Sequence, residues 1–216
     1  MVRSAFVFAV AVALTGIVSA QSLTNAQILD AIKAGEAKKF DHLISDCIAT
    51  AGFGENMSAG INGGIMRTGS FDVVLSTNAG RIAYMAARAK RLYKKLTPED
   101  ITQDLRRPAV VVTVEPKDPS QMSNGISVAA PIEHIVLKSK VIAEDVAQPR
   151  SVEKEVVEWS NLLGGKVQGN RAVAFFDYGS VKELPPGEFD IVVITTSGER
   201  RCKVGLKDRQ KLFAAQ

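Results

Sequence analysis

The stretch LPPGEFDIVVITTSG at residues 184–198 carries the clearest fold signal in the chain. Pro186 and Gly187 fit the two central positions of a type II turn, because proline fixes φ and glycine tolerates φ above zero. The following segment, Phe189–Thr196, has apolar residues on both faces of a strand, which predicts a central position in a sheet. Ser197 and Gly198 then turn the chain back into a last strand at Arg200–Leu206.

Other β signals fill the second half of the chain. A β-branched run and three further segments predict strands: Ala109–Glu115, Ile126–Ala129, Ile132–Lys138 and Arg171–Tyr178. Ser151–Leu163 has helical spacing but could equally be a strand, and we expect a strand because its neighbours are β. The turn-strand-turn-strand ending resembles, in pattern only, the last hairpin of many extracellular sandwich modules, over about 25 residues, and this implies no function.

The first half of the chain is mainly helical in pattern. A capping box at Thr24–Gln27 begins one helix, and the glycine-rich segment Gly52–Gly69 indicates a loop. Apolar spacing predicts a second helix over Phe40–Ala51, a strand at Phe71–Leu75, a helix over Ala79–Leu96 and a short helix from Thr97 that ends before Pro108. We therefore expect an α+β fold, with an N-terminal helical segment packed on a C-terminal, mainly antiparallel β-sheet or sandwich.

Residues Met1–Ala20 have the pattern of a signal peptide. Arg3 gives a positive start, an apolar run follows from Ala5 to about Val18, and Val18-Ser19-Ala20 supplies small residues for cleavage. The run is too short to span a bilayer as a helix, and no second apolar run of spanning length follows. We expect export of a soluble protein to the periplasm or the extracellular space. The remaining chain divides into 21–107, mainly helical, and 108–216, mainly β, which can together form one domain.

Composition excludes several classes of protein and partner. The 216 residues are 46% hydrophobic and 23% charged, which excludes a disordered or disulfide-dense chain. The 27 Lys and Arg against 23 Asp and Glu leave the chain mildly basic, too little to indicate a nucleic-acid partner.

The two cysteines are candidates for a disulfide. Cys202 alternates with Val204 and Leu206 on the last strand, and Cys47 shares the apolar side of the predicted helix Phe40–Ala51. Both are expected to face the core, and an oxidising destination favours a Cys47–Cys202 bond. Two separate buried thiols remain the alternative.

The helix predicted at 81–95 carries a basic stripe. Arg81, Arg88, Arg91 and Lys95 recur at helical spacing, with Tyr84 among them. Such a face could bind a polyanion or an acidic membrane surface. The alternative is a solvated face whose long side chains cover the edge of the core.

Familiar catalytic and metal-binding motifs are absent from the sequence. The chain contains no G-x-S-x-G, H-E-x-x-H, P-loop or C-x-x-C pattern. A metal site at His42 or His134 would need carboxylates such as Asp41, Asp46 or Glu133. Asp41 points about 100° away from His42 on a helix, and Glu133 and His134 face opposite sides of a strand, so the sequence predicts no metal site and no cofactor. We expect a non-enzymatic binding or envelope module, whose partner is another envelope or extracellular protein or a polyanion. The alternative is a hydrolase-like enzyme with a carboxylate site that spacing does not reveal.

Overall fold

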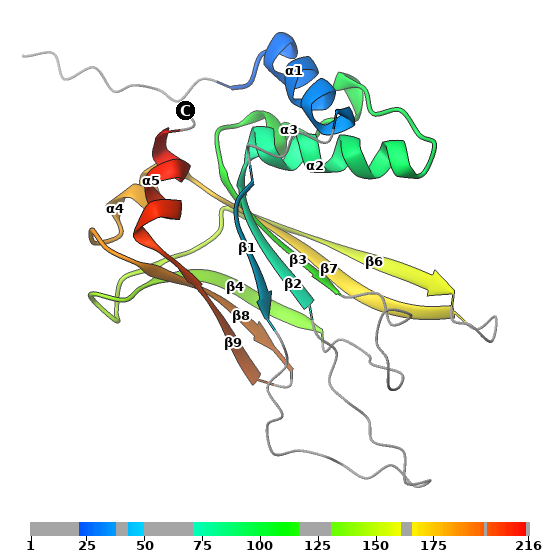
Figure 1. Ribbon diagram of the computed structural model, residues 1–216. Helices are drawn as coiled ribbons and strands as arrows, with labels where there is room; N and C mark the ends of the chain where they lie inside the picture. Colours follow the sequence, from blue (N-terminus) through cyan, green and yellow to red (C-terminus); the bar gives the residue numbers. More distant parts are fainter. Residues whose placement is uncertain are drawn as a thin grey trace, which may run out of the picture.

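Two antiparallel sheets and a layer of helices make up the fold (Figure 1). The computed structural model describes residues 22–37, 43–49, 71–116, 131–160, 166–196 and 198–214, with only the backbone described at 43–49. Four predicted features lie outside these residues: the signal segment Met1–Ala20, the loop Gly52–Gly69, the strand Ile126–Ala129 and residue His42.

The first sheet has five strands in the order β1-β2-β3-β7-β6, and each neighbouring pair is antiparallel. Its strands are β1 (Leu43–Ala49), β2 (Phe71–Thr77), β3 (Val110–Pro116), β6 (Ser151–Ser160) and β7 (Lys166–Phe176). β3 is central, and its valines are buried on both faces because alternate side chains point to opposite sides. The pairing of β2 with β3 crosses the predicted boundary between residues 107 and 108, so both regions contribute to this sheet.

The second sheet has four strands in the order β5-β4-β8-β9, again antiparallel. Its strands are β4 (Ile132–Ser139), β5 (Val146–Ala147), β8 (Phe189–Thr195) and β9 (Gly198–Val204). The central position predicted for the 189–196 segment is confirmed, because β8 lies between β4 and β9. Gly187 has a positive φ of 147° before β8, which agrees with the predicted sign but lies far from the value of about 80° in a type II turn.

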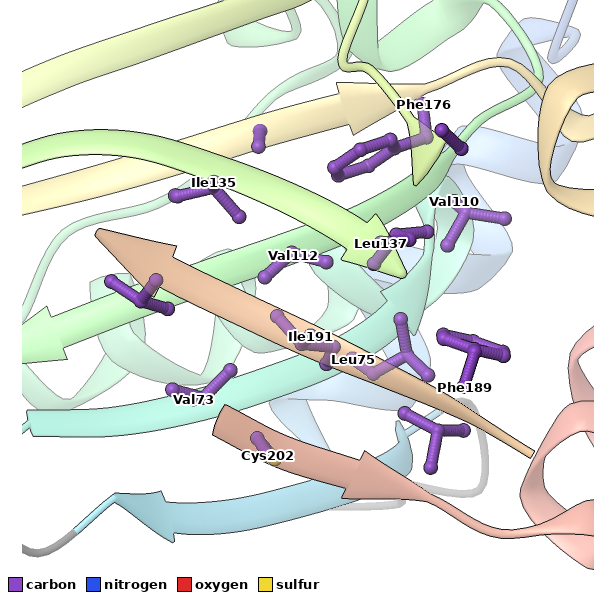
Figure 2. Packing of buried hydrophobic residues seen from close by; sticks show 14 of the residues in the cluster. Val73, Leu75, Val110, Val112, Ile135, Leu137, Phe176, Phe189, Ile191 and Cys202 are labelled. Carbon is purple, nitrogen blue, oxygen red and sulfur yellow. The ribbon is translucent and has the colours of Figure 1, made fainter. Parts of the chain in front are cut away.

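The main core lies between the two sheets, as Figure 2 shows. Side chains of β2, β3 and β7 meet those of β4, β8 and β9. Fully buried members include Leu75, Val110, Val112, Phe176, Ile135, Leu137, Phe189 and Ile191. Each such side chain contributes about 1.5–3 kcal/mol through burial, so this layer supplies much of the driving force for folding.

Helices cover the other face of the first sheet and enclose a second core. They are α1 (Asn25–Glu36), α2 (Asn78–Arg91), the 3₁₀ turn η1 (Pro98–Asp100) and α3 (Gln103–Arg106). Ile28 and Ile32 of α1 and Ile82 of α2 pack with Val111 and Phe175 of the sheet. The capping box predicted at Thr24 is confirmed, since Thr24 and Gln27 bond reciprocally.

The expected α+β architecture is confirmed, and so is the strand expected within Ser151–Leu163, which is β6. The helix predicted over Phe40–Ala51 is wrong, because Leu43–Ala49 forms β1 and pairs with β2. The apolar residues of this segment fit the period of a helix and that of a strand. Pairing with the edge of β2 makes the segment a strand. The helix predicted to reach Leu96 ends at Arg91. Two helices were not predicted: α4 (Tyr178–Glu183) and α5 (Leu206–Ala214).

Candidate functional site

The four cations predicted as one exposed stripe lie in two different environments. Arg81 is buried, with 8% of its surface exposed, and its guanidinium lies 5.6 Å from the centre of the Tyr84 ring. Arg88 is partly exposed and its Nη1 lies 2.6 Å from Oε1 of Glu115. Arg91 and Lys95 are exposed. The structure therefore separates an inner pair, which faces the first sheet, from an outer pair in solvent.

Glu115, near the end of β3, is the centre of a polar cluster beneath α2. Tyr84 donates its hydroxyl hydrogen to Oε2 at 2.6 Å, and Arg88 donates to Oε1. Arg171 of β7 also donates to Oε1, and its Nη1 donates to Glu155 of β6 at 2.7 Å. These five residues, called here the Glu115 cluster, join the helical layer to three strands of the first sheet.

Burial dominates the electrostatics around this cluster. It raises the pKa of Tyr84 to about 12, and the hydrogen bond to Glu115 adds to that shift. Burial also lowers the pKa of Arg81, and the negative charge of Glu115 acts against this shift. On β6, burial raises the pKa of Glu153, and the nearby charge of Asp104 acts in the same direction.

The contacts of Glu115 indicate a structural role for the cluster. Both carboxylate oxygens already accept hydrogen bonds, from one phenol and two guanidinium groups. The fold thus holds this carboxylate in place through three side chains, and the hydrolase alternative stays a prediction. Sequence reasoning missed Glu115, Glu155 and Arg171, because β3, which carries Glu115, is far in the chain from the paired strands β6 and β7.

A second group of cations surrounds the C-terminal end of α2. Residues 90–95, with the sequence KRLYKK, are all exposed, and we call them the cationic tip. At its centre Leu92 is 58% exposed and Tyr93 is 100% exposed. Lys90 donates from Nζ to the backbone oxygen of Glu36 at 2.8 Å, which ties the start of the tip to α1.

The backbone of the tip is held by a Schellman motif. The N–H of Tyr93 donates to Lys90 at 3.1 Å, and the N–H of Lys94 donates to Ala89 at 2.8 Å. Tyr93 has φ of 56°, at the position where this motif usually has glycine. The turn thus presents a tyrosine ring to solvent between two pairs of cations.

A small open pocket lies next to the tip. Tyr84, Ala87, Arg88 and Arg91 line a volume of about 120 Å³. This is room for a small anionic group, such as a phosphate or a carboxylate. Arg88 belongs both to this pocket and to the Glu115 cluster, so its guanidinium is oriented by the fold.

The placement of the cysteines supports the predicted disulfide. Cys202 is buried at 2% exposure and disulfide-bonded, and Cys47 is the other cysteine of the chain. The strands that carry them, β1 and β9, pack against each other. The side chain of Cys47 lies outside the described part of the structure, so the Cys47–Cys202 pairing stays a prediction.

Neither a metal site nor a relative identifies the function. Among the described residues, no three His, Cys, Asp or Glu side chains gather to hold a metal ion, and His134 is exposed on β4. The helices in the described part of the chain are too short or too polar to cross a membrane. Comparison with family models, curated proteins and solved structures found no match to this chain.

Proposed function

We propose that this protein is an exported, non-enzymatic binding module, and that the cationic tip attaches it to an anionic membrane surface. Export rests on the pattern of Met1–Ala20. The observation that carries the binding proposal is the exposure of Leu92 and Tyr93 between Lys90, Arg91, Lys94 and Lys95. Exposed apolar side chains flanked by cations suit the boundary between lipid headgroups and acyl chains.

The stability of α2 explains only some of the residues at its C-terminal end. Cations in the last turn of α2 interact favourably with the helix dipole, which explains Arg88, Lys90 and Arg91. The dipole does not require an exposed leucine, nor a tyrosine at a backbone conformation that favours glycine. An anionic surface gives both features a role, since each Lys or Arg near it contributes about 1 kcal/mol and the two apolar side chains add burial.

Vesicle co-sedimentation tests the proposal. The mature protein is mixed with vesicles that contain an anionic lipid or only zwitterionic lipid, at low and high salt. We expect binding to the anionic vesicles alone, weakened by salt because the charges are screened. The variant Arg91→Gln/Lys94→Gln/Lys95→Gln should lose most of this binding.

A matched control removes the same charge elsewhere. Lys182→Gln/Arg200→Gln/Lys207→Gln changes cations on α4, on β9 and on α5, away from the tip in Figure 1. We expect this control to bind like the unchanged protein. Equal loss in both triple variants would show that net charge, rather than the tip, causes binding, and would contradict the proposal.

The apolar pair separates a membrane from a soluble polyanion. Leu92→Ser/Tyr93→Ser keeps every cation and should still weaken vesicle binding. If the protein is retained on a heparin column but does not bind vesicles, the tip binds a soluble polyanion, and the membrane proposal is overturned.

A further inference from the structure

The outermost strand of the first sheet, β6, has one unpaired edge in the described structure. β6 pairs with β7 along all ten of its residues, from Ser151 opposite Phe175 to Ser160 opposite Lys166, without a register shift. It stands last in the strand order, so its other edge pairs with no described strand. Figure 1 shows β6 on the outer side of the hairpin that it forms with β7, away from the second sheet.

Most side chains of β6 are also exposed, although Lys154 donates to the backbone oxygen of Glu133 at 3.4 Å and Glu155 accepts from Arg171. Val152 to Val156 are exposed without interruption, and the two valines are 37% and 57% exposed. Proteins commonly blunt a free edge with proline, with a bulge, with charged side chains or by shortening the strand. β6 contains no proline, has no bulge and is ten residues long, but it carries charges of both signs at 153, 154, 155 and 158. Such an edge is suited to pairing only with a strand whose charges complement its own.

We propose that β6 pairs with β6 of a second copy, antiparallel and centred on Val156. In this register Lys154 lies opposite Glu158 of the second copy, and Glu158 lies opposite its Lys154. Val156 lies opposite its own equivalent. Because alternate residues share a face of the strand, Lys154, Val156 and Glu158 are on one side of the joined sheet. This proposal is independent of the cationic tip.

Charge selects this register over its neighbours. Centring the pair on Lys154 places two lysines opposite each other and also opposes Glu153 to Glu155. Centring it on Glu155 opposes two glutamates, and centring it on Val157 opposes no like charges but forms no Lys154–Glu158 pair. Opposite-charge pairs stabilise a ladder and directly opposed like charges destabilise it. With Val156 at the centre, Glu155 lies opposite Val157, and its charge is already compensated by Arg171.

The joined structure is one continuous sheet through two molecules. The five-stranded sheets of the two copies would meet at their β6 edges, with the helical layers on the same face of the combined sheet. β-strand addition of this kind obtains affinity from main-chain hydrogen bonds and register from side chains. The second copy is therefore the occupant that the sequence of β6 specifies.

Sedimentation equilibrium of the mature protein tests the proposal with charge-reversed variants. We expect a reversible dimer. Lys154→Glu and Glu158→Lys each place like charges at two positions of the interface, and each should raise the dimer Kd by roughly tenfold or more. Lys182→Glu on α4 is the matched control and should leave the Kd unchanged.

Mixing the two charge-reversed variants gives the decisive result. In the heterodimer every Glu at 154 or 158 faces a Lys, so an equal mixture should dimerise with nearly the original Kd. This rescue requires both variants to be folded and therefore separates register from misfolding. A protein that stays monomeric at all concentrations, or a dimer that the mixture does not restore, would overturn the proposal.

Discussion

The Glu115 carboxylate accepts hydrogen bonds from Tyr84, Arg88 and Arg171, and the Arg171 side chain is only 6% exposed. Glu115→Gln removes the negative charge and leaves these guanidinium groups beneath α2. We expect the free energy of unfolding to fall by about 3 kcal/mol, as when one partner of a buried ion pair is removed. Urea denaturation at pH 7 measures this.

The control is a carboxylate in an exposed pair. Glu199 pairs with Arg201, and both side chains are about half exposed. Glu199→Gln should therefore lower the free energy of unfolding by less than about 1 kcal/mol. Similar losses in the two variants would show that the Glu115 cluster does not stabilise the fold through its burial.

Tyr84 gives the protein a stability that depends on pH in the alkaline range. The pKa of Tyr84 is about 12 in the fold, against an ordinary value of about 10. Between these values the folded state binds more protons than the unfolded state, so stability falls as pH rises. We expect Tyr84→Phe to reduce this fall between about pH 10 and pH 12, measured by urea denaturation, whereas Tyr93→Phe changes an exposed ring and should not. If the free energy of unfolding falls equally with pH in the unchanged protein and both variants, Tyr84 is not the source of this pH dependence.

At the scale of the element, the end of α2 is determined by a residue that sequence reasoning does not expect there. Tyr93 has the left-handed φ of a Schellman motif, where glycine has no steric penalty. Tyr93→Gly should raise the free energy of unfolding by about 1 kcal/mol. Leu92→Gly, one position earlier at φ of −92°, should not stabilise. A destabilised Tyr93→Gly protein would mean that the ring makes contacts that outweigh this strain.

The contact between α1 and α2 depends on a glycine. A Cβ added at Gly35 would lie 2.0 Å from the backbone oxygen of Ala83, so the two helices would have to separate. Gly35→Ala should lower the free energy of unfolding by about 1–3 kcal/mol, as overpacking does. Gly179→Ala on α4 has no atom within 4 Å of the new Cβ and should be neutral or slightly stabilising. Thermal denaturation of both variants makes the comparison, and equal melting temperatures would contradict it.

Elements with one dominant period could be predicted from their own residues, whereas elements that fit two periods depended on their neighbours, which indicated the strand β6 correctly and did not indicate β1. The segments at 109–115 and 189–196 are runs of β-branched residues, and they form the buried strands β3 and β8. Apolar residues at 43, 44, 47 and 48 fit a helix as well as a strand, and pairing with β2 makes β1 a strand. The helix α5 was missed because its burial rests on few residues, among them Arg209, which donates to backbone oxygens of Leu184 and Pro185.

The candidate sites, too, could be predicted from the sequence only in part. The cations of α2 could be found from their helical spacing, but their environments could not. Glu115 and Arg171 are 56 positions apart, and only the strand order β3-β7-β6 brings them together with Glu155. Spacing within one element predicts which residues share a face, whereas pairing between distant strands determines which of them become buried and paired.

At the scale of the whole molecule, the two sides of the sandwich differ. On one side β1, an edge of the first sheet, packs against β9, an edge of the second sheet, and α5 lies beside β1. On the other side β6 is the outermost strand of the first sheet, and its second edge pairs with no strand in the described part of the chain. One side is thus closed within the chain, and the other is open to a second copy.

A Cys47–Cys202 disulfide would lock the closed side, because it joins β1 to β9 and closes a loop that spans most of the mature chain. The chain-entropy estimate gives about 5 kcal/mol as an upper value for such a loop. We expect a reductant to lower the urea midpoint of the unchanged protein markedly and to leave that of Cys47→Ala/Cys202→Ala unaffected. Thiol titration of the unreduced, denatured protein should find no free thiol. Two free thiols per chain would refute the bond, and a mixed disulfide between two chains would appear as a covalent dimer without reductant.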